Sequence, residues 1–507
     1  MKILIYILFF FPITHLLAQA DLSGTVTFPD SVGVSKVTKT FITPGVYVEE
    51  ISRLPFTVKE EESAIPAFVG YTEIAAKDDS DDLLMSPIKI SSLLEYQQYF
   101  GEANCEKYEI TVVEDTLNNL FEVKIDRDTS GNLYKMHYAL QMFFANGGGK
   151  CYIVSVGHYN DSISADKLMQ GLEQVSKEDE PTILVIPDAI ELVNTRYYEV
   201  INTALGQCNT LLDRVAIIDV PCINVYIEND VEIFRNQITD NIELLKYGAA
   251  YYPYLETNLK YHYKEEDVII IKHTEKNGGN IPNSLIGKTL NSDEVKKNTN
   301  VLYKQIITAI KKINVILSPS STIAGVYTKV DRTRGVWKAP ANVSLINVIN
   351  PTIRITDEDQ GSLNTDPKEG KSINAIRSFT GKGTLVWGAR TLAGNDNEWR
   401  YISVRRFFNM VEESIKKSTY WAVFEPNDAK TWIKVKSTIE NYLKLKWRDG
   451  ALAGAKPDDA FFVNIGLGTT MTSQDILEGR MNIQIGMAVI RPSEFIILQF
   501  SHKMHNE

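Results

Sequence analysis

Cysteine is scarce in this chain of 507 residues, which contains only Cys105, Cys151, Cys208 and Cys222. None of them belongs to a Cys-x-x-Cys pair, and four cysteines in so long a chain do not make a disulfide framework. We interpret them as ordinary core or surface thiols.

Catalytic motifs are also missing. The seven histidines are scattered, and no Gly-x-Ser-x-Gly nucleophile elbow occurs in the sequence. His502 and His505 are close together, but they belong to the tail of the chain, where solvated side chains are a better interpretation than a metal site. A hydrolase therefore stays an alternative with no motif behind it, and we expect no catalytic residue, no metal, no cofactor and no small-molecule substrate.

A glycine-rich stretch, Asn146-Gly147-Gly148-Gly149-Lys150, invites comparison with a phosphate-binding loop. Such a loop follows a strand and opens a helix, and its lysine is followed by Ser or Thr. Here a helical pattern precedes the glycines, a strand pattern follows them, and the residue after the lysine is Cys151. We predict the end of a helix and a turn instead.

Three groups of carboxylates stand where chemistry is sometimes found. Asp188 and Asp219 follow or end apolar strands, a position that catalytic carboxylates often occupy in α/β folds. Without a neighbouring histidine or metal motif, we predict turn and cap roles for both. The run Asp78 to Asp82 lacks the glycine and the distal glutamate of a calcium loop, so we expect a solvated loop.

The charge of the chain is unevenly distributed. The formal net charge is −11, which argues against a general nucleic-acid binder. From Ile376 to Glu507 there are 18 Lys/Arg and 14 Asp/Glu, a net of +4, which leaves −15 for all the residues before. This asymmetry indicates either a directional contact with an acidic partner or random surface variation.

Between residues 61 and 330, apolar runs alternate with helical patterns. Strands are expected at Ile65–Tyr71, Cys151–Val156, Ile183–Ile186, Val215–Val220 and Ala249–Tyr254. Helices are expected at Ser91–Phe100 (through Leu94, Tyr96 and Tyr99), Tyr134–Ala145, Tyr197–Cys208, Phe234–Leu245 and Val301–Ile316. The alternation predicts an α/β layer with a largely parallel sheet. Two polar stretches near 102–132 and 257–297 interrupt it; the first has an irregular pattern, and we interpret both as insertions.

Residues 331–507 have a different, α+β pattern. A helix is expected at Val404–Lys417, and a second with Trp432, Val435, Ile439 and Leu443 on one face, for which Asn427 is a candidate cap. Strands are expected at Ala460–Ile465, Asn482–Val489 and Phe495–Phe500.

Both ends of the chain offer a short strand separable from a core. Residues 38–60 contain a weakly alternating stretch around Pro44-Gly45, and the last strand begins at Phe495. An unpaired strand exposes backbone N–H and C=O groups and tends to pair with another chain. Two such strands can bridge different neighbours, and head-to-tail links of this kind produce rings or helical polymers.

The first 20 residues have the features of a secretory signal: Lys2, the apolar run Ile3 to Phe11, and a small-residue cleavage site at Ala18-Gln19-Ala20. They support the alternative of a secreted surface or adhesion protein.

Several ordered motifs give the chain a family resemblance. They are Thr43-Pro44-Gly45-Val46-Tyr47-Val48-Glu49-Glu50, Ala64 to Thr72, Phe143 to Val154, Tyr251 to Leu255, Ile323 to Tyr327, Arg334 to Asn342, Leu363-Asn364, Ile373 to Arg377, Val386-Trp387-Gly388-Ala389-Arg390-Thr391 and Arg491-Pro492-Ser493-Glu494-Phe495-Ile496-Ile497. Over about residues 38 to 504 the chain resembles phage tail sheath proteins and their relatives in contractile injection systems, including type VI secretion-like systems.

The resemblance implies a multidomain sheath fold, α/β plus α+β, whose middle domain looks like a subtilisin fold without the catalytic triad. It implies hexameric rings stacked around an inner tube, with baseplate and terminator proteins as further partners. The family's exchanged strands correspond to Val46, Tyr47 and Val48 in the arm, and to Phe495, Ile496, Ile497 and Leu498 near the C-terminus. The basic C-terminal third would face the tube, and the insertions would decorate the outer surface.

The resemblance also bears on the start of the protein. Members of this family assemble in the cytoplasm without a signal and then form part of a phage tail or an extracellular or injection particle, so residues 1–37 are either a signal-like leader or an upstream mis-assignment. No methionine lies between Met1 and Met85, whereas Val34 and Val37 are possible non-standard start codons. We expect the native start near Val34; an intact mass that begins at Asp21 would contradict this.

Overall fold

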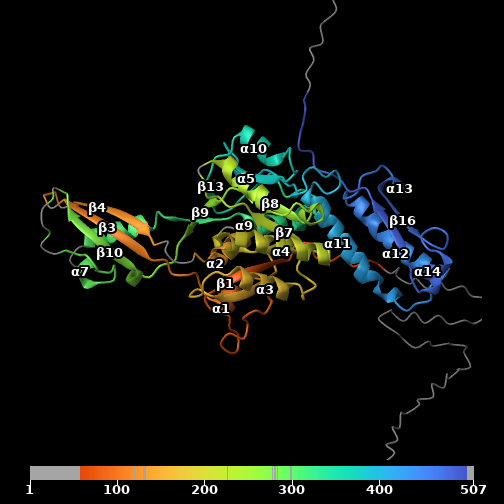
Figure 1. Cartoon of the computed structure of the whole chain (residues 1–507), viewed down its shortest axis with the longest axis horizontal. Coiled ribbons are helices and arrows are strands. Elements are labelled where there is room, and N and C mark those ends of the chain that lie inside the picture. The colour runs from red at the N-terminus through yellow and green to blue at the C-terminus, as the bar shows by residue number, and fades with distance from the viewer. Residues whose placement is uncertain are drawn as a thin grey trace, which may run out of the picture. The chain divides into compact units, whose positions relative to one another are not determined.

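The largest element of the fold is a nine-stranded sheet in the order β12-β15-β14-β8-β7-β6-β1-β5-β2 (Figure 1). The computed structural model describes residues 57–498, apart from 116, 119, 129–132, 194, 225, 277, 279–280, 282–283 and 297–299. The expected arm at 38–56, with Val46, Tyr47 and Val48, and the tail from residue 499, with His502 and His505, lie outside the described residues.

Six neighbouring strands of this sheet run parallel. The apolar runs predict five of them: β8 (Gly248–Tyr252), β7 (Val215–Asp219), β6 (Ile183–Val185), β1 (Pro66–Thr72) and β5 (Cys151–His158); they do not predict β14 (Ile373–Phe379). The remaining three pair antiparallel at the two sides: β2 (Ile88–Ile90), β15 (Gly383–Val386) and β12 (Val343–Ser344). The sheet therefore continues past residue 330, because β12, β14 and β15 come from later in the chain.

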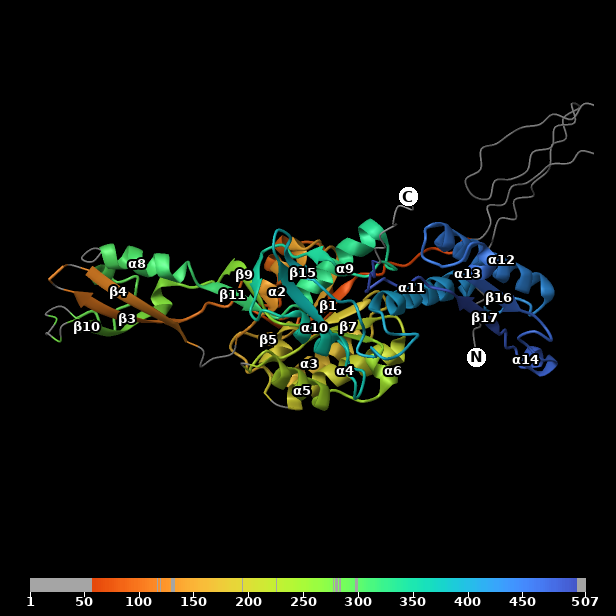
Figure 2. The ribbon, with the colours of Figure 1, turned by 90° about the horizontal axis from the view of Figure 1, so that it is seen from above.

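Both faces of the sheet are covered by helices, as β1 shows. Phe68 packs edge-on against Phe143 of α2 (Met136–Ala145) on one face. Its neighbour Val69 points to the other face, where a methyl group at Gly171 of α3 (Ala165–Val175) would come within 2.6 Å of its Cγ1. Figure 2 shows α2 and α9 (Ser320–Arg334) on one side of the strands and α3 and α4 (Thr195–Leu211) on the other. Because both faces are buried, the strands have continuous apolar sequences.

The glycine-rich stretch ends a helix, as predicted. α2 stops at Ala145, Gly147 adopts a φ of +106°, and β5 begins at Cys151. No helix starts at these glycines, so the geometry of a phosphate-binding loop is missing.

The two insertions form one lobe, and the prediction that residues 102–132 are irregular is wrong. They contain β3 (Tyr108–Asp115) and β4 (Leu120–Arg127), which join β10 (Val268–Glu275) of the second insertion in a three-stranded sheet. Tyr108, Ile110 and Val112 are buried against α8 (Asn300–Ile310), and the polar residues Glu109 and Thr111 alternate with them, so that the segment does not stand out as an apolar run. The lobe also holds α7 (Asp293–Lys296), and a further sheet has the order β11-β9-β13 (Asn314–Leu317, Leu255–Lys260, Val348–Pro351).

Three helix predictions need correction. The helix expected at Phe234–Leu245 is two helices, α5 (Ile227–Gln237) and α6 (Ile242–Leu245), because Asn241 caps the second one. The helix expected at Val301–Ile316 ends at Ile310, and its last residues belong to β11. In α1 (Leu93–Phe100), Tyr96 and Phe100 are buried while Leu94 is exposed.

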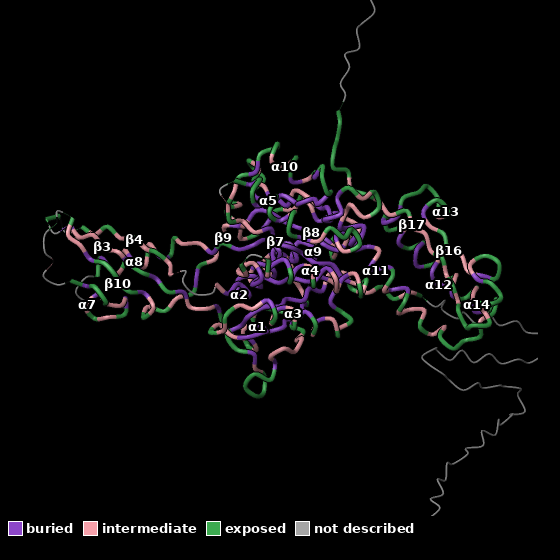
Figure 3. Tube along the Cα trace, in the orientation of Figure 1, coloured by how far each residue is buried: buried purple, intermediate pink, exposed green. Residues whose placement is uncertain are grey.

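The C-terminal residues have a core of their own, formed mainly by α11 (Ile402–Thr419), α12 (Ala429–Arg448), β16 (Phe461–Ile465) and β17 (Ile483–Met487) (Figure 3). Asp428 caps α12, with its Oδ1 accepting from Thr431 N at 2.9 Å. The predicted cap, Asn427, instead accepts a hydrogen bond from Trp432 Nε1 at 2.7 Å. The shorter helices are α10 (Asp357–Asn364), α13 (Pro457–Ala460), α14 (Ser473–Leu477) and the 3-10 turns Pro187–Glu191, Glu265–Asp267 and Tyr420–Ala422. Among the described helices we find no candidate membrane span.

Candidate assembly surfaces

The segment that ends the described chain is apolar and exposed. Phe495, Ile496, Ile497 and Leu498 have exposed fractions of 76%, 80%, 83% and 71%. None of the four belongs to a strand in the isolated chain, so the strand expected at Phe495–Phe500 has no sheet partner among the described residues. Four consecutive exposed apolar residues are costly in water and are typical of a segment that binds elsewhere.

The residue before this segment is firmly held. The Glu494 carboxylate accepts from Arg390 Nε at 3.0 and 3.2 Å, from Arg390 Nη2 at 2.5 Å and from the Tyr401 hydroxyl at 3.2 Å. Arg390 is only 6% exposed and also donates to the Asn364 carbonyl at 3.0 Å. A bidentate ion pair of this kind fixes direction as well as distance. The chain therefore leaves its own surface at a defined point.

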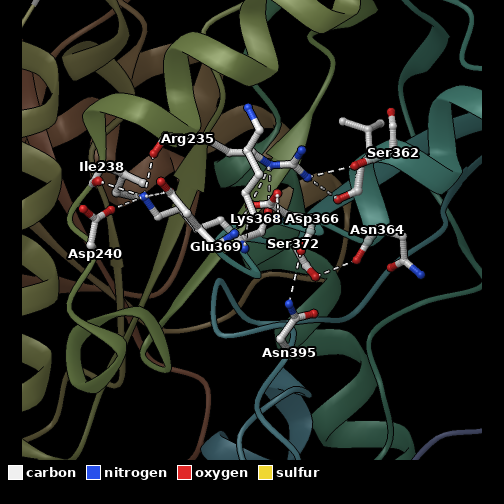
Figure 4. Close-up of polar contacts among 12 residues, drawn as sticks. Arg235, Ile238, Asp240, Ser362, Asn364, Asp366, Lys368, Glu369, Ser372 and Asn395 are labelled. Carbon is white, nitrogen blue, oxygen red and sulfur yellow. Dashed lines mark hydrogen bonds and ion pairs between the residues drawn. The ribbon is translucent and has the colours of Figure 1, made fainter.

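The loop beneath Arg390 is fixed by a second polar network (Figure 4). The Asn364 carbonyl that accepts from Arg390 also accepts from Ser372 Oγ at 2.7 Å. Nearby, the buried Lys371 ammonium donates to the carbonyls of Arg235 and Ile238 at 2.6 and 3.2 Å, at the end of α5. The network ties residues 364–372 to the helix layer of the large sheet.

At the other end of the described chain, residues 57–63 lie along α11. Lys59 N and Glu61 N donate to Ser418 Oγ and Ser414 Oγ, both at 3.0 Å. Further on, the carbonyl of Ser63 accepts from Arg406 Nη2 at 2.9 Å. Because the two serines are four residues apart on α11, they match the alternating N–H groups of an extended chain.

Three acidic side chains of this linker meet three lysines. Glu60 lies 2.6 Å from Lys446 of α12, Glu61 lies 3.3 Å from Lys417 of α11, and Glu62 lies 2.8 Å from Lys150. Asp179 also approaches Lys417, at 2.8 Å. Burial of the Lys417 ammonium lowers its pKa, but Asp179 and Glu61 together outweigh this and raise it.

The strands β16 and β17 form a sheet of only two strands, which packs on α12. Phe461, Val463 and Ile485 face this core, and Phe462 and Gly486 lie opposite each other on the other face. Within the described part of the chain, neither strand has a second strand partner. A two-stranded sheet is marginal by itself and can accept a strand at either edge.

Helix α12 presents a basic stripe. Of its charged residues, Lys430, Lys434, Lys436, Lys444, Lys446 and Arg448 are positive and only Glu440 is negative. Lys430, Lys434, Lys444 and Arg448 are all exposed and recur at helical spacing on one face.

The carboxylates that could have indicated an enzyme have structural roles. The Asp188 carboxylate accepts from Tyr71 N and Lys135 N at 2.7 and 2.6 Å, and Asp219 accepts from Ser320 N at 2.7 Å, at the start of α9. Burial raises the pKa of both to about 6. The Asp82 carboxylate closes its own loop by accepting from the N–H groups of Lys77, Asp78 and Asp79. Among the described residues no group of His, Cys, Asp and Glu is arranged to hold a metal ion.

Comparison with known proteins shows which family has this architecture. The sequence model of one protein family, the phage tail sheath C-terminal domain, matches residues 394–503. Two solved structures correspond over nearly the whole chain. The PVC sheath complex of an extracellular contractile injection system, in its contracted state, is 31% identical with a TM-score of 0.60, and the match covers 92% of this chain and 99% of that one. The helical sheath of the anti-feeding prophage, also contracted, is 31% identical with a TM-score of 0.59, covering 93% and 100%. This chain belongs to the tail sheath family.

Phage sheath proteins are more distant relatives. The tail sheath protein of Enterobacteria phage T4 is 27% identical over 128 residues, which is 25% of this chain and 19% of that protein. The tail sheath protein of Burkholderia phage BcepMu is 28% identical over 142 residues, which is 27% of this chain and 29% of that protein. This sheath chain thus matches less than a third of the length of these phage relatives. The family is one of structural proteins rather than enzymes, in agreement with the roles of Asp188 and Asp219.

The sequence pointed to the motifs around Arg390 and Glu494 but gave neither residue a role. The two are 104 residues apart, and no local pattern pairs them. Arg406 and Ser63 are 343 residues apart, and no local pattern pairs them either. The signal that was available is the position of Glu494 directly before the predicted exchange segment.

Proposed function

We propose that this protein is the sheath subunit of a contractile injection particle, which polymerises as stacked hexameric rings around an inner tube and contracts to drive the tube through a target envelope. The observation that carries this proposal is the near-full-length match, at 31% identity, to two sheaths solved in the contracted state. A match to the anti-feeding prophage baseplate, at 30% identity over 93% of this chain, supports contact with baseplate proteins. A terminator protein at the other end of the tube would complete the particle.

Assembly would proceed by strand exchange between neighbouring subunits. The exposed segment Phe495, Ile496, Ile497 and Leu498 is short and apolar and has no strand partner in the described chain, as a strand that completes another subunit's sheet should. The open edges of β16 and β17 are the natural acceptors. The arm at 38–60, through Val46, Tyr47 and Val48, would add a strand from a second neighbour. Each subunit would then be linked to others by backbone hydrogen bonds, which survive large rigid-body rotations.

The basic stripe of α12 would face the inner tube. Its exposed lysines and Arg448 give the C-terminal domain a dense positive surface in a chain that is acidic elsewhere. Charge complementarity with an acidic tube surface would set the orientation of the subunit without requiring tight binding, so that the sheath can release the tube when it contracts.

The finer divisions of the fold belong to this proposal. Residues 1–37 would be a leader or a mis-assigned start. The α/β domain with a subtilisin-like sheet, expected at 61–330, would also take in β12, β14 and β15, and the rest of 331–507 would form the C-terminal sheath domain. The lobe built from the insertions near 102–132 and 257–297 would decorate the outer surface. The subunit would assemble in the cytoplasm and then form part of a phage tail or extracellular particle.

Contraction needs no cofactor in this account. The extended sheath would be a metastable packing, and the contracted one would bury more interface between rigid subunits. A gain on the order of a few kcal/mol per subunit, a small fraction of ordinary interface energies, is sufficient when it is summed over many subunits.

The exchange is tested with two deletions and one matched substitution. Removing Thr40–Ser52, or all residues after Glu494, should leave a folded monomer that does not form tubes. Replacing Phe495 and Ile497 by aspartate should have the same effect, whereas Leu117→Asp, at an equally exposed apolar residue (83%) on the insertion lobe, should not. Tubes of normal length from either deletion would defeat the strand-exchange proposal.

A further inference from the structure

At each end of the described chain, residues near a proposed exchange segment contact a buried arginine. For the C-terminal segment this is Arg390, whose guanidinium binds Glu494. For the N-terminal linker it is Arg406, which is 3% exposed. Arg406 binds both oxygens of Asp331 at 3.1 and 2.6 Å and also donates to the Ser63 carbonyl, while the Ser63 hydroxyl donates to Asp331 at 2.6 Å. Both ends are thus held by a charged, desolvated and geometrically specific contact.

The Arg390 contact leads directly into the large sheet. Arg390 N donates to Asn374 Oδ1 at 2.7 Å, and Asn374 Nδ2 donates back to the Arg390 carbonyl at 2.8 Å. Asn374 lies on β14 and also donates to the Ala250 carbonyl of β8 at 3.0 Å. The backbone on which Arg390 sits is therefore fixed to two neighbouring strands.

The Arg406 contact is connected to the same part of the large sheet. The Arg406 guanidinium lies 4.5 Å from the centre of the Tyr327 ring on α9. The Tyr327 hydroxyl is 2.8 Å from the hydroxyl of Tyr251, which lies on β8. Tyr251 is the register partner of Asn374 in the β8–β14 pair. Both networks therefore reach the sheet at one pair of opposed residues.

We propose that Arg390 and Arg406 are positioning residues for assembly: they anchor the roots of the two exchange segments, Glu494 and residues 57–63, to the Tyr251–Asn374 position of the sheet, so that each root is held at a fixed point. This inference rests on the proposed strand exchange and adds to it the residues that hold the strands ready. Neither arginine needs to contact a neighbouring subunit.

The physical reason is the cost of ordering a chain segment. A segment that swings freely loses conformational entropy when it joins another sheet, whereas a segment whose root is fixed has already lost part of it. Fixed roots also transmit the pull of a neighbour to the rigid sheet rather than to a loose linker. Loosening a root should therefore weaken polymerisation without weakening the fold.

The test compares gentle variants of each root in the full-length chain. Glu494→Gln removes the charge that Arg390 binds, and Tyr401→Phe removes only the weaker donor. The double variant Ser414→Ala/Ser418→Ala removes the two bonds that hold Lys59 N and Glu61 N along α11, and Arg406→Lys removes the fork that spans Asp331 and Ser63. The matched control is Glu199→Gln, which breaks a surface ion pair with Arg196 on α4, away from both roots.

Three quantities are measured: the Tm of the monomer, the mobility of each root (a spin label at residue 497 for the C-terminal root, amide hydrogen exchange of residues 57–63 for the N-terminal one), and the critical concentration for tube formation by sedimentation. We expect the Tm to stay within about 2 °C of wild type for Glu494→Gln and for the serine double variant, and to fall further for Arg406→Lys, which loses a buried bidentate contact. Mobility should rise at the loosened root only, and the critical concentration should rise about tenfold. For Tyr401→Phe, the mobility of the C-terminal root and the critical concentration should lie between the values for wild type and for Glu494→Gln. Glu199→Gln should change none of the three quantities.

The outcomes distinguish a failure of the positioning role from a failure of the strand exchange on which it rests. If chains lacking residues 495–507 still form normal tubes, the strand exchange itself fails. If those chains do not assemble but the variants of both roots assemble at the wild-type critical concentration, the positioning role of the arginines is contradicted and the proposed strand exchange is not. Greater mobility at the roots with unchanged assembly would equally overturn the positioning role.

Discussion

The Asp219 carboxylate lies at the first residue of α9, where it accepts from both the backbone N–H of Ser320 at 2.7 Å and the Ser320 hydroxyl at 2.6 Å. The strand β7 ends at Asp219, so one side chain joins the end of a buried strand to the start of the helix that covers it. Burial raises the pKa of Asp219 from an ordinary value of 3.8 to about 6.

This raised pKa predicts a pH-dependent contribution to stability. Because the folded pKa lies above the unfolded one, the contribution is fully present below about pH 4 and is lost as the pH rises through about 6. Asp219→Asn does not titrate, and its amide can still accept from Ser320 N. The Tm of wild type minus that of Asp219→Asn should therefore fall between pH 4 and pH 7, by the equivalent of about 3 kcal/mol at most. Parallel Tm curves for the two proteins would contradict the assignment.

Two glycines on neighbouring helices give a matched test of the sheet packing. A methyl group at Gly171 of α3 would lie 2.5 and 2.6 Å from Val156 and Val69 of the sheet, while one at Gly206 of α4 meets nothing within 4 Å. Gly171→Ala should lower the free energy of unfolding by about 1–3 kcal/mol through overpacking. Gly206→Ala should raise it by about 0.5–1 kcal/mol through helix propensity. Denaturant titration of the monomers measures both; equal effects would contradict the helix placement.

Charge reversal on α12 tests the contact with the tube. Replacing Lys430, Lys444 and Arg448 by glutamate should abolish co-sedimentation with the tube protein, because the stripe would then repel an acidic surface. Self-assembly of the variant without the tube should persist.

The control for this reversal lies on α8 of the insertion lobe and in the turn that follows it, where replacing the exposed residues Lys304, Lys311 and Lys312 by glutamate changes the net charge equally. This variant should bind the tube as wild type does. Equal loss of binding in both variants would show that only net charge matters and would remove α12 from the account.

Much of the α/β body could be predicted from the sequence, because its signals are local. A strand such as Val215–Asp219 is buried on both faces and is therefore continuously apolar, and Gly147 marks the end of α2 through a backbone conformation that side chains disfavour. The prediction of Leu94 as a core contact was wrong because Tyr96 and Phe100, four residues apart, define the buried face of α1 instead.

What could not be predicted depends on residues far apart in the chain. β10 pairs with β3 across more than a hundred residues, so the insertion lobe has no local signature beyond weak alternation. Arg406 meets Asp331 across 75 residues, and each looks like an ordinary surface charge in the sequence, although Arg406 is buried and Asp331 is half-buried. Long-range ion pairs of this kind are decided by the fold, and so are the roots of the exchange segments.

Polymerisation of this chain through its two ends can be tested by electron microscopy. The chain expressed from Val34 is imaged in negative stain, alone and with a co-expressed tube protein, beside the same chain without residues 495–507. We predict hollow striated tubes from the first and monomers from the second. Monomers from the chain with its ends intact, even when the tube protein is present, would contradict the account.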